Sequence, residues 1–209
     1  MMEAMSEAVS KSLGKTVTLE PASGGGYSGR GGASTSVVID PETNTKYFCK
    51  SAGGGHDMLK AEYLGVKEMS NTHTIQVPTP IAFGEGPNNV AFVVFEYIDF
   101  CGGGSQYELG VQLAKMHNIF SANGKFGFHV DNTIGATPQP NLPWMDDWAD
   151  FWETHRLGHM LKLTGDAGMS KADVERLREK TRELLSHKPE PSLLHGDLWG
   201  GTYYWSKME

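Results

Sequence analysis

The feature that most constrains the fold is a change of patterning at one glycine run, Gly102–Gly104. Before this run, short apolar and β-branched segments alternate with turn residues, as strands do. After it, apolar residues recur at the spacing of amphipathic helices. We therefore predict an α+β protein of two lobes, with a strand-rich domain over residues 1–100 and a helical domain over residues 101–209.

The first domain is expected to begin with a helix over residues 1–14, which ends at a glycine. Strands over residues 35–39 and 45–50 should form a hairpin, because turn residues separate them. A helix is predicted over residues 56–69. Residues 90–98 form an apolar run broken only by one glutamate, so this strand should be buried on both faces of its sheet.

The second domain is expected to begin with an amphipathic helix over residues 105–120. Its apolar face consists of Leu109, Leu113, Met116 and Phe120. Residues 121–145 are rich in Gly, Pro and Asn and should form a loop. The next helix carries side chains one turn apart at Trp148, Trp152, His155 and His159. Ser170 and Asp173 resemble a capping box that opens a last helix. The side chains expected to face inward from that helix are Val174, Leu177, Leu184 and Leu185.

Composition excludes several classes of function. The chain has 209 residues, with 18 Lys and Arg against 25 Asp and Glu, and its net charge of −7 argues against a general nucleic-acid binder. No apolar run approaches the roughly 20 residues of a membrane-spanning helix. Cys49 and Cys101 have neither metal-ligand spacing nor the density of a disulfide scaffold, which favours a reduced intracellular setting. Met1–Ser10 does not resemble a secretory signal, and we predict a cytoplasmic protein.

Three features of the first domain, in order, are typical of nucleotide binding. Gly24, Gly25 and Gly26 open a glycine-rich turn, in which backbone N–H groups can approach phosphates because no Cβ intervenes. Lys50 ends the next predicted strand, where the alternative is an edge lysine that reaches water. Glu62 lies on the following helix, where a solvated face is the alternative. This order of glycine turn, strand lysine and helix glutamate is that of the small lobe of kinases, in which the glutamate holds the lysine.

The most specific segment is Leu193–Gly201, which reads Leu-Leu-His-Gly-Asp-Leu-Trp-Gly-Gly. It matches the catalytic-loop pattern of kinases, with Asp197 where a base accepts the proton of the substrate hydroxyl. A helix cap or a turn carboxylate is the alternative for Asp197. We expect His195 to pack and hydrogen-bond beneath the site without taking part in the transfer.

The chain resembles the fructosamine or ketosamine kinases, also called protein-ribulosamine 3-kinases, which are relatives of the aminoglycoside and choline phosphotransferases. The resemblance covers nearly the whole chain. Its motifs are Phe92–Ile98, Leu113–His117, Phe126–Phe128, Asp131–Gly135, Asp147–Trp148, Arg156–Leu157 and Leu194–Trp199. Generic aminoglycoside kinases share the His-Gly-Asp core but lack the Phe-Gly-Phe, Asp-Asn-Thr-Ile-Gly and Asp-Leu-Trp motifs.

This resemblance implies a two-lobed, protein-kinase-like fold and ATP-dependent phosphorylation of a sugar hydroxyl on a ketosamine. A ketosamine is here a lysine amine that carries a fructose-type or ribulose-type sugar. Phosphorylation at the 3-position makes the adduct labile, so the implied role is protein deglycation repair, acting on a glycated lysine or a small ketosamine. The implied cofactors are ATP and Mg²⁺.

The resemblance also implies a role for each candidate residue. Lys50 would hold the ATP phosphates, and Glu62 would orient Lys50. The backbone that would bond adenine belongs to Glu96, Tyr97 and Ile98. Asp197 would be the base. Trp199 would pack on the sugar, with ordinary core packing as the alternative.

The sequence departs from the family pattern at three places. Tyr27 stands where the family often has a cysteine linked to redox-dependent dimerisation, so redox control is not expected there. Thr202 stands where kinases place an Asn that binds magnesium, and none of residues 203–209 is an Asp. We therefore expect no intact metal site. We also expect a complete small lobe and a truncated large lobe, with apolar side chains exposed on residues 105–120 and 173–185.

Other functions remain open at this stage. The chain could be a catalytically silent, nucleotide-binding remnant, or a phosphotransferase for another small molecule on the same fold. Magnesium-dependent ATP turnover with a glycated lysine would distinguish the first alternative, and a panel of acceptors would distinguish the second. A pure interaction module would give no thermal-shift response to ATP.

Overall fold

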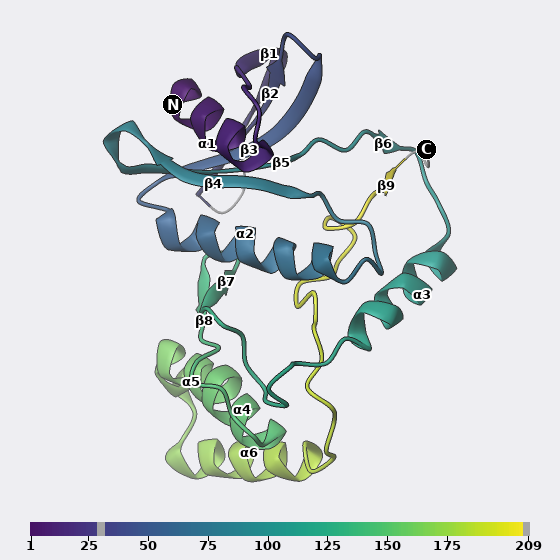
Figure 1. Cartoon of the computed structure of the whole chain (residues 1–209). Coiled ribbons are helices and arrows are strands. Elements are labelled where there is room, and N and C mark those ends of the chain that lie inside the picture. The colour runs from purple at the N-terminus through teal and green to yellow at the C-terminus, as the bar shows by residue number, and fades with distance from the viewer. Residues whose placement is uncertain (29–31, 207–209) are drawn as a thin grey trace. The chain divides into compact units, whose positions relative to one another are not determined.

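In a computed structural model, which describes residues 1–28 and 32–206, the chain divides into two compact units (Figure 1). The first unit joins Met1–Met116 to the segment that begins at His195, and the second unit is His117–Leu194. These units differ from the two predicted lobes, whose boundary near residue 100 stays a prediction.

The first unit is built on an antiparallel five-stranded sheet with the strand order β1-β2-β3-β5-β4. A second, two-stranded sheet pairs β6 with β9. The elements of this unit are α1 (Met2–Leu13), β1 (Glu20–Ser28), β2 (Ser34–Asp40), β3 (Thr45–Gly53), α2 (His56–Asn71), β4 (Pro80–Gly86), a 3₁₀ turn (Pro87–Asn89), β5 (Val90–Glu96), β6 (Phe100–Cys101), α3 (Gln106–His117) and β9 (Trp205–Ser206).

Helices cover both faces of the five-stranded sheet, with α1 on one face and α2 on the other (Figure 1). Met5 and Val9 of α1 are buried in one apolar cluster with Val94 of β5. Leu59 of α2 is buried in a second cluster with Val93 of the same strand. Because neighbouring residues of a strand point to opposite faces, β5 supplies both clusters. The prediction that this strand is buried on both faces is confirmed, although it ends at Glu96.

Local sequence signals set the other elements of the first unit. The predicted first helix is confirmed and is followed by Gly14, whose φ of 64° is the left-handed conformation that glycine adopts without strain. The predicted hairpin is β2 and β3, in which Val38 lies opposite Tyr47. The predicted helix at residues 56–69 is α2. No helix in the described part of the chain is long and apolar enough to cross a membrane.

The prediction for residues 105–120 needs one correction. The helix is α3 and ends at His117, and Met116 is its buried residue. Phe120 does not face inward, because it lies beyond the helix end and is 52% exposed. Its backbone forms an isolated antiparallel bridge with Ser192, which holds this stretch in an extended conformation.

The second unit is built from short elements. The sequence did not predict its hairpin, which lies within residues 121–145, where we expected a loop. The elements are β7 (Asn132–Ile134), β8 (Thr137–Gln139), α4 (Trp148–Trp152), a π-helical turn (Glu153–Leu157), α5 (Gly158–Thr164), a 3₁₀ turn (Gly165–Gly168) and α6 (Lys171–Leu184). The predicted capping box is confirmed, since the Ser170 hydroxyl accepts a hydrogen bond from the Asp173 N–H at 3.2 Å.

The helix predicted around residues 148–159 is interrupted by the π-helical turn. Gly158 permits this geometry, because a Cβ at that position would lie 2.6 Å from the carbonyl oxygen of Glu153. A π-helical turn contains one residue more than an α-helical turn, so the side chains beyond it are rotated relative to a regular helix. Residues on either side of the turn therefore do not follow the simple one-turn spacing of the prediction.

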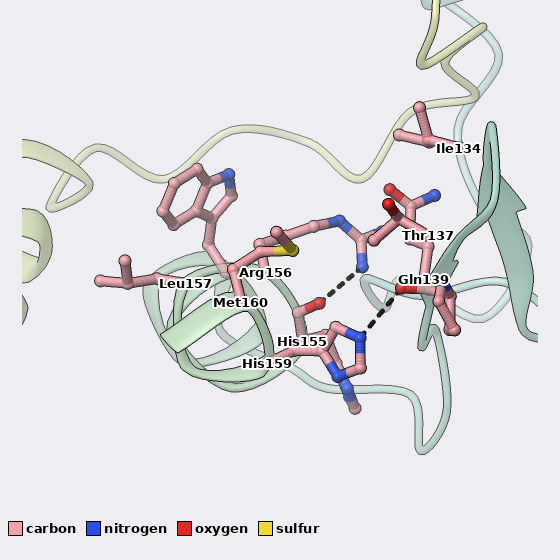
Figure 2. A pocket seen from close by; sticks show the side chains of 10 residues that line it. Ile134, Thr137, Gln139, His155, Arg156, Leu157, His159 and Met160 are labelled. Carbon is pink, nitrogen blue, oxygen red and sulfur yellow. Dashed lines mark hydrogen bonds between the residues drawn. The ribbon is translucent and has the colours of Figure 1, made fainter. Parts of the chain in front are cut away.

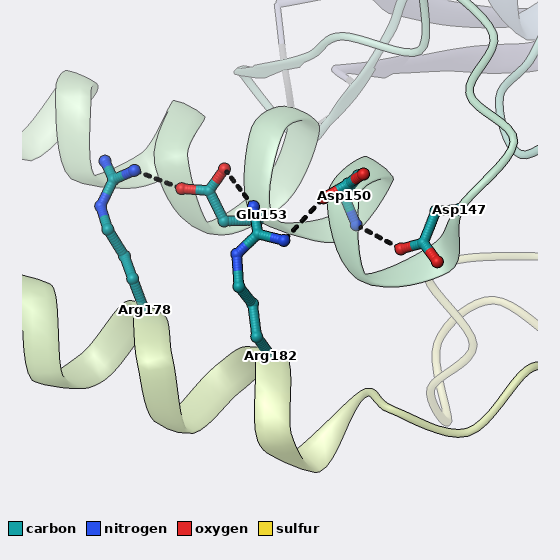
Figure 3. Close-up of polar contacts among 5 residues, drawn as sticks. All are labelled: Asp147, Asp150, Glu153, Arg178 and Arg182. Carbon is teal, nitrogen blue, oxygen red and sulfur yellow. Dashed lines mark hydrogen bonds and ion pairs between the residues drawn. The ribbon is translucent and has the colours of Figure 1, made fainter.

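Charged contacts join α6 to α4 and the π-helical turn (Figure 3). Arg178 forms an ion pair with Glu153, and Arg182 forms one with Asp150 at 2.6 Å. The buried apolar contribution of α6 is small, because Val174 is its one buried residue. Leu177 and Leu184 were expected to face inward, and they are 37% and 66% exposed. The accompanying expectation of exposed apolar side chains on residues 173–185 is confirmed.

Candidate nucleotide and catalytic site

The centre of the candidate site is an ion pair between Lys50 on β3 and Glu62 on α2. Lys50 lies within the sheet, opposite Thr35 on one side and Val93 on the other. Glu62 comes one helical turn after Leu59, which anchors α2 on the same face of the sheet. Each of the two charged side chains is about 30% exposed. The pair is thus held by packed elements but remains open to solvent and to a ligand.

The glycine-rich segment is only in part the turn that we predicted. Gly24, Gly25 and Gly26 lie within β1, which pairs with β2 and ends at Ser28. The register between these strands shifts between Pro21 and Gly26, which marks a bulge in β1 that includes two of the glycines. The predicted turn extended to Gly32, and its residues 29–31 lie outside the described residues.

The segment predicted to bond adenine follows directly from β5. Glu96 ends the strand, and its carboxylate accepts hydrogen bonds from the N–H of Thr79 at 3.0 Å and from its hydroxyl at 2.6 Å. Tyr97 and Ile98 lie beyond the strand. The Lys46 ammonium lies 5.4 Å from the centre of the Tyr97 ring. The Glu96 side chain is therefore occupied, so a ligand would meet the backbone of this segment.

From His195 onward, the predicted catalytic loop is an irregular segment of the first unit, and residues 196–200 are exposed. Gly196 has a φ of 84°, a conformation that a residue with a side chain rarely adopts. The N–H of Asp197 donates a hydrogen bond to Nδ1 of His195 at 3.3 Å. The His195 ring therefore supports the backbone of the loop, and the Asp197 side chain is exposed.

Trp199 lies two residues further along and is 56% exposed. Its ring packs directly over Gly201, where a Cβ would collide with it. This exposure excludes ordinary core packing, the alternative that the sequence left open for Trp199. A large, exposed aromatic ring two positions from a carboxylate is a suitable surface for the apolar face of a small ligand.

The Thr202 hydroxyl is engaged within the loop. It donates to the carbonyl oxygens of Asp197 at 3.2 Å and Trp199 at 2.9 Å, and it accepts from the N–H of Trp199 at 3.0 Å. Within residues 1–28 and 32–206, no group of three or more His, Cys, Asp or Glu side chains could hold a metal ion. At the position where kinases place a magnesium-binding Asn, this chain therefore offers a Thr hydroxyl that is already engaged within the loop, which does not fit that part of a kinase metal site.

Contacts that the sequence did not predict attach this loop to the first unit. β9 pairs with β6, so that Trp205 lies opposite Cys101. The Tyr204 and Phe100 rings stack with their centroids 4.6 Å apart. The Ser206 hydroxyl donates to Oε1 of Gln76 at 2.6 Å. Because of these contacts, Asp197 and the Lys50–Glu62 pair belong to the same compact unit.

A five-stranded sheet with a strand lysine paired to a helix glutamate, followed by a His-Gly-Asp loop, defines a protein-kinase-like fold. A solved structure from Haemophilus somnus, described as a "Putative fructosamine-3-kinase", superposes with a TM-score of 0.81 and 23% identity, covering 99% of this chain and 69% of that one. A structure of the same description from Thermobifida fusca gives a TM-score of 0.75 at 24% identity, covering 96% and 69%.

Sequence comparison identifies the family. The family model described as fructosamine kinase matches residues 1–209, and the chain belongs to this family. It is 41% identical over 169 residues to a "Probable ketoamine kinase" of Synechocystis, covering 79% of this chain and 56% of that protein. It is 40% identical over 179 residues to a chloroplastic protein-ribulosamine 3-kinase of Oryza sativa, covering 82% and 52%. The chain thus spans about half the length of these curated relatives.

Proposed function

We propose that the chain transfers the γ-phosphoryl group of ATP to a sugar hydroxyl of a ketosamine on a lysine amine, as a step in deglycation repair. One observation carries this proposal: the Lys50–Glu62 ion pair lies in the same compact unit as the loop that presents Asp197. Family membership supports the substrate class, since the relatives are named ketoamine and ribulosamine kinases. The predicted cytoplasmic location stays a prediction, because the rice relative is named chloroplastic.

ATP, when bound, supplies the phosphoryl group. In the proposed site, the Lys50 ammonium binds phosphate oxygens, and the Glu62 carboxylate keeps that ammonium directed toward them. The backbone of Gly24, Gly25 and Gly26, at and beside the bulge in β1, covers the phosphates. Backbone groups of Glu96, Tyr97 and Ile98 bond the adenine edge.

Asp197 is the proposed base. Its carboxylate accepts the proton of the sugar hydroxyl while the hydroxyl oxygen forms a bond to the γ-phosphorus, and the bond from that phosphorus to the bridging oxygen of ADP breaks. Trp199 packs against the sugar and limits its orientations. No step is assigned to a metal ion, because Thr202 stands where kinases place a metal-binding Asn and its hydroxyl is engaged within the loop.

The test measures ATP binding and turnover separately on the full chain. Turnover is followed with fructosyl-lysine or ribulosyl-lysine as acceptor, and ATP binding is followed by calorimetry. The substitution Asp197→Asn should lower kcat by about 10²- to 10⁴-fold and leave the ATP dissociation constant unchanged. The substitution Asp166→Asn, at an exposed carboxylate of the second unit, should change neither quantity.

Three outcomes would contradict the proposal. If Asp197→Asn retains full turnover, Asp197 is not the base. If the unsubstituted chain binds ATP but transfers nothing to either acceptor above background, the chain is a nucleotide-binding protein without transferase activity. Phosphorylation of an aminoglycoside in place of both ketosamines would overturn the substrate class.

A further inference from the structure

The second unit contains a cavity of about 400 Å³ between the β7–β8 hairpin and the helical segment that contains the π-helical turn (Figure 2). One wall is the β7–β8 hairpin, and the other is the π-helical turn with the start of α5. The lining residues are Ile134, Thr137, Pro138, Gln139, Trp152, His155, Arg156, Leu157, His159 and Met160. None of them has a role in the proposed phosphoryl transfer. This volume is at the lower end of the range for small-molecule sites in proteins.

Hydrogen bonds hold the two walls of the cavity together. Nε2 of His159 lies 2.9 Å from the carbonyl oxygen of Pro138, which ties α5 to the hairpin. The Arg156 guanidinium donates to the carbonyl oxygen of Pro140 at 2.6 Å and to Oδ1 of Asn141 at 2.8 Å. Asn141 is itself buried and is 3% exposed. The cavity is therefore formed by fixed elements, so a ligand would find its walls already in place.

Arg156 differs from the other arginines of the second unit in having no carboxylate partner among residues 1–28 and 32–206. Arg176, Arg178 and Arg182 on α6 each form an ion pair with an Asp or Glu. The acceptors of Arg156 in the described part of the chain are neutral oxygens, and its guanidinium lies 4.9 Å from the centre of the Phe151 ring.

The guanidinium of Arg156 is thus partly buried and has no carboxylate partner among the described residues. Burial lowers the pKa of this guanidinium from its ordinary value, which is the expected consequence. Partial burial of a charge that has only neutral partners costs free energy, and an anion placed beside it recovers part of that cost. A guanidinium has five N–H groups, and its hydrogen bonds to Pro140 and Asn141, with a third to the carbonyl oxygen of His155 at 3.0 Å, use only part of that capacity.

We propose that this cavity binds a small organic carboxylate with an apolar or aromatic body. The carboxylate accepts hydrogen bonds from Arg156, and the apolar body lies against Trp152, Leu157 and Met160. The proposed ligand follows from the cavity itself: a single uncompensated cation, set in a largely apolar lining, selects a single negative charge on an apolar group. The site is independent of the proposed transferase activity, because all its residues lie in the second unit.

The experiment compares two probes that differ in charge but hardly in shape, 2-naphthoate and 2-naphthamide. Both are titrated into the full chain without nucleotide, and binding is followed by ¹H–¹⁵N chemical shifts and by calorimetry. We expect 2-naphthoate to bind at least about tenfold more tightly than the amide, since a hydrogen bond to a charged group is worth roughly that factor. The shifts that change should be those of β8, the π-helical turn and α5.

A pair of variants on the hairpin tests the location without disturbing Arg156, whose substitution could unfold the unit. Thr137→Glu places a negative charge at an exposed residue that lines the cavity, and should weaken 2-naphthoate binding about tenfold. Thr133→Glu adds the same charge to the same hairpin at an exposed residue outside the lining and should have little effect. Equal affinity for acid and amide, equal weakening by both variants, or no binding at millimolar concentration would each overturn the proposal.

Discussion

The strand β5 and the helix α6 are stabilised in different ways. In β5 five consecutive residues, Ala91–Phe95, are buried, and helices cover them from both sides. In α6 only Val174 is buried, and the helix is joined to its neighbours by ion pairs of Arg178 and Arg182. The hydrophobic effect therefore holds the sheet of the first unit, and charged contacts contribute much of what holds α6. Substitutions in the two elements should differ accordingly.

The largest effect is expected in the sheet. Phe92 is 1% exposed, and the end of its ring would lie 2.7 Å from a Cβ at Gly84. The substitution Phe92→Ala should lower the free energy of unfolding by about 3–5 kcal/mol, because it removes the transfer energy of the ring and leaves a cavity. Urea denaturation, with hydrogen exchange at the β5 amides, measures the loss.

A more conservative substitution serves as the control at this position. Phe92→Leu retains most of the volume and should cost about 1 kcal/mol. If Phe92→Ala costs less than Phe92→Leu, or if neither change accelerates exchange in β5, the sheet does not depend on this apolar cluster.

An intermediate effect is expected at the ion pairs. Glu153 is the carboxylate between Arg178 and Arg182, and its side chain is 13% exposed. Glu153→Gln removes this charge and leaves Arg178 without its partner, so we expect a loss of about 1–2 kcal/mol. Glu183→Gln is the matched control, because Glu183 pairs with Lys180 in an exposed position and should contribute about 0.5 kcal/mol or less.

The dependence of these stability losses on salt concentration distinguishes charged contacts from apolar ones. Raising the ionic strength screens exposed charges strongly and partly buried charges less, so at about 1 M salt the loss caused by Glu183→Gln should vanish, and the loss caused by Glu153→Gln should narrow in part. The Phe92→Ala loss should not narrow in this way. If Glu153→Gln proves neutral at low salt, α6 is held by its few apolar contacts and the contrast between the two elements fails.

The fold was most predictable where a local signal sufficed. Gly14 and the Ser170 cap mark helix boundaries through their own backbone and side-chain chemistry, and both predictions are confirmed. The pairing of β6 with β9 joins residues about a hundred positions apart, and strands this short have no hydrophobic periodicity from which the pairing could be predicted. The π-helical turn depends on the contact that Gly158 permits with Glu153, so the helical spacing of the sequence concealed it.

In the candidate site, too, features set by local sequence could be predicted, and features that depend on distant residues could not. The order of a strand lysine and a helix glutamate predicted a pair, and Lys50 and Glu62 form it. The sequence identified Thr202 as a departure from the kinase pattern but could not predict its hydrogen bonds within the loop. The cavity beside Arg156 could not be predicted, because its lining comes from two separate segments and its chemistry depends on a missing partner.

Alkaline conditions should weaken the first unit through a buried thiol. Burial raises the pKa of Cys49 to about 12, from an ordinary value of 9.0. Because the folded pKa is higher than the unfolded one, the stabilising contribution is complete below pH 9 and is lost as the pH rises toward 12. Between about pH 8 and about pH 10, the free energy of unfolding should fall by about 1 kcal/mol through this group.

The control for this pH dependence is Cys49→Ala, which removes the thiol and should flatten the slope between about pH 8 and about pH 10. The pKa of Tyr47 is also raised, by burial and then by the charge of Asp40, so a residual slope at higher pH should remain in both proteins. An unchanged slope in Cys49→Ala would show that the thiol does not ionise with unfolding in this range.

The smallest effect is expected at the exposed end of α6. Leu184 is 66% exposed, so Leu184→Ala removes little buried area and should change the free energy of unfolding by about 0.5 kcal/mol or less. Leu184 is apolar, like the buried side chains of β5, so the comparison with Phe92→Ala isolates the effect of burial. A loss of 2 kcal/mol or more in the free energy of unfolding would mean that the Leu184 side chain is covered in solution by a contact that the described residues do not provide. The difference between β5 and α6 would then depend on what surrounds α6 and not on its sequence.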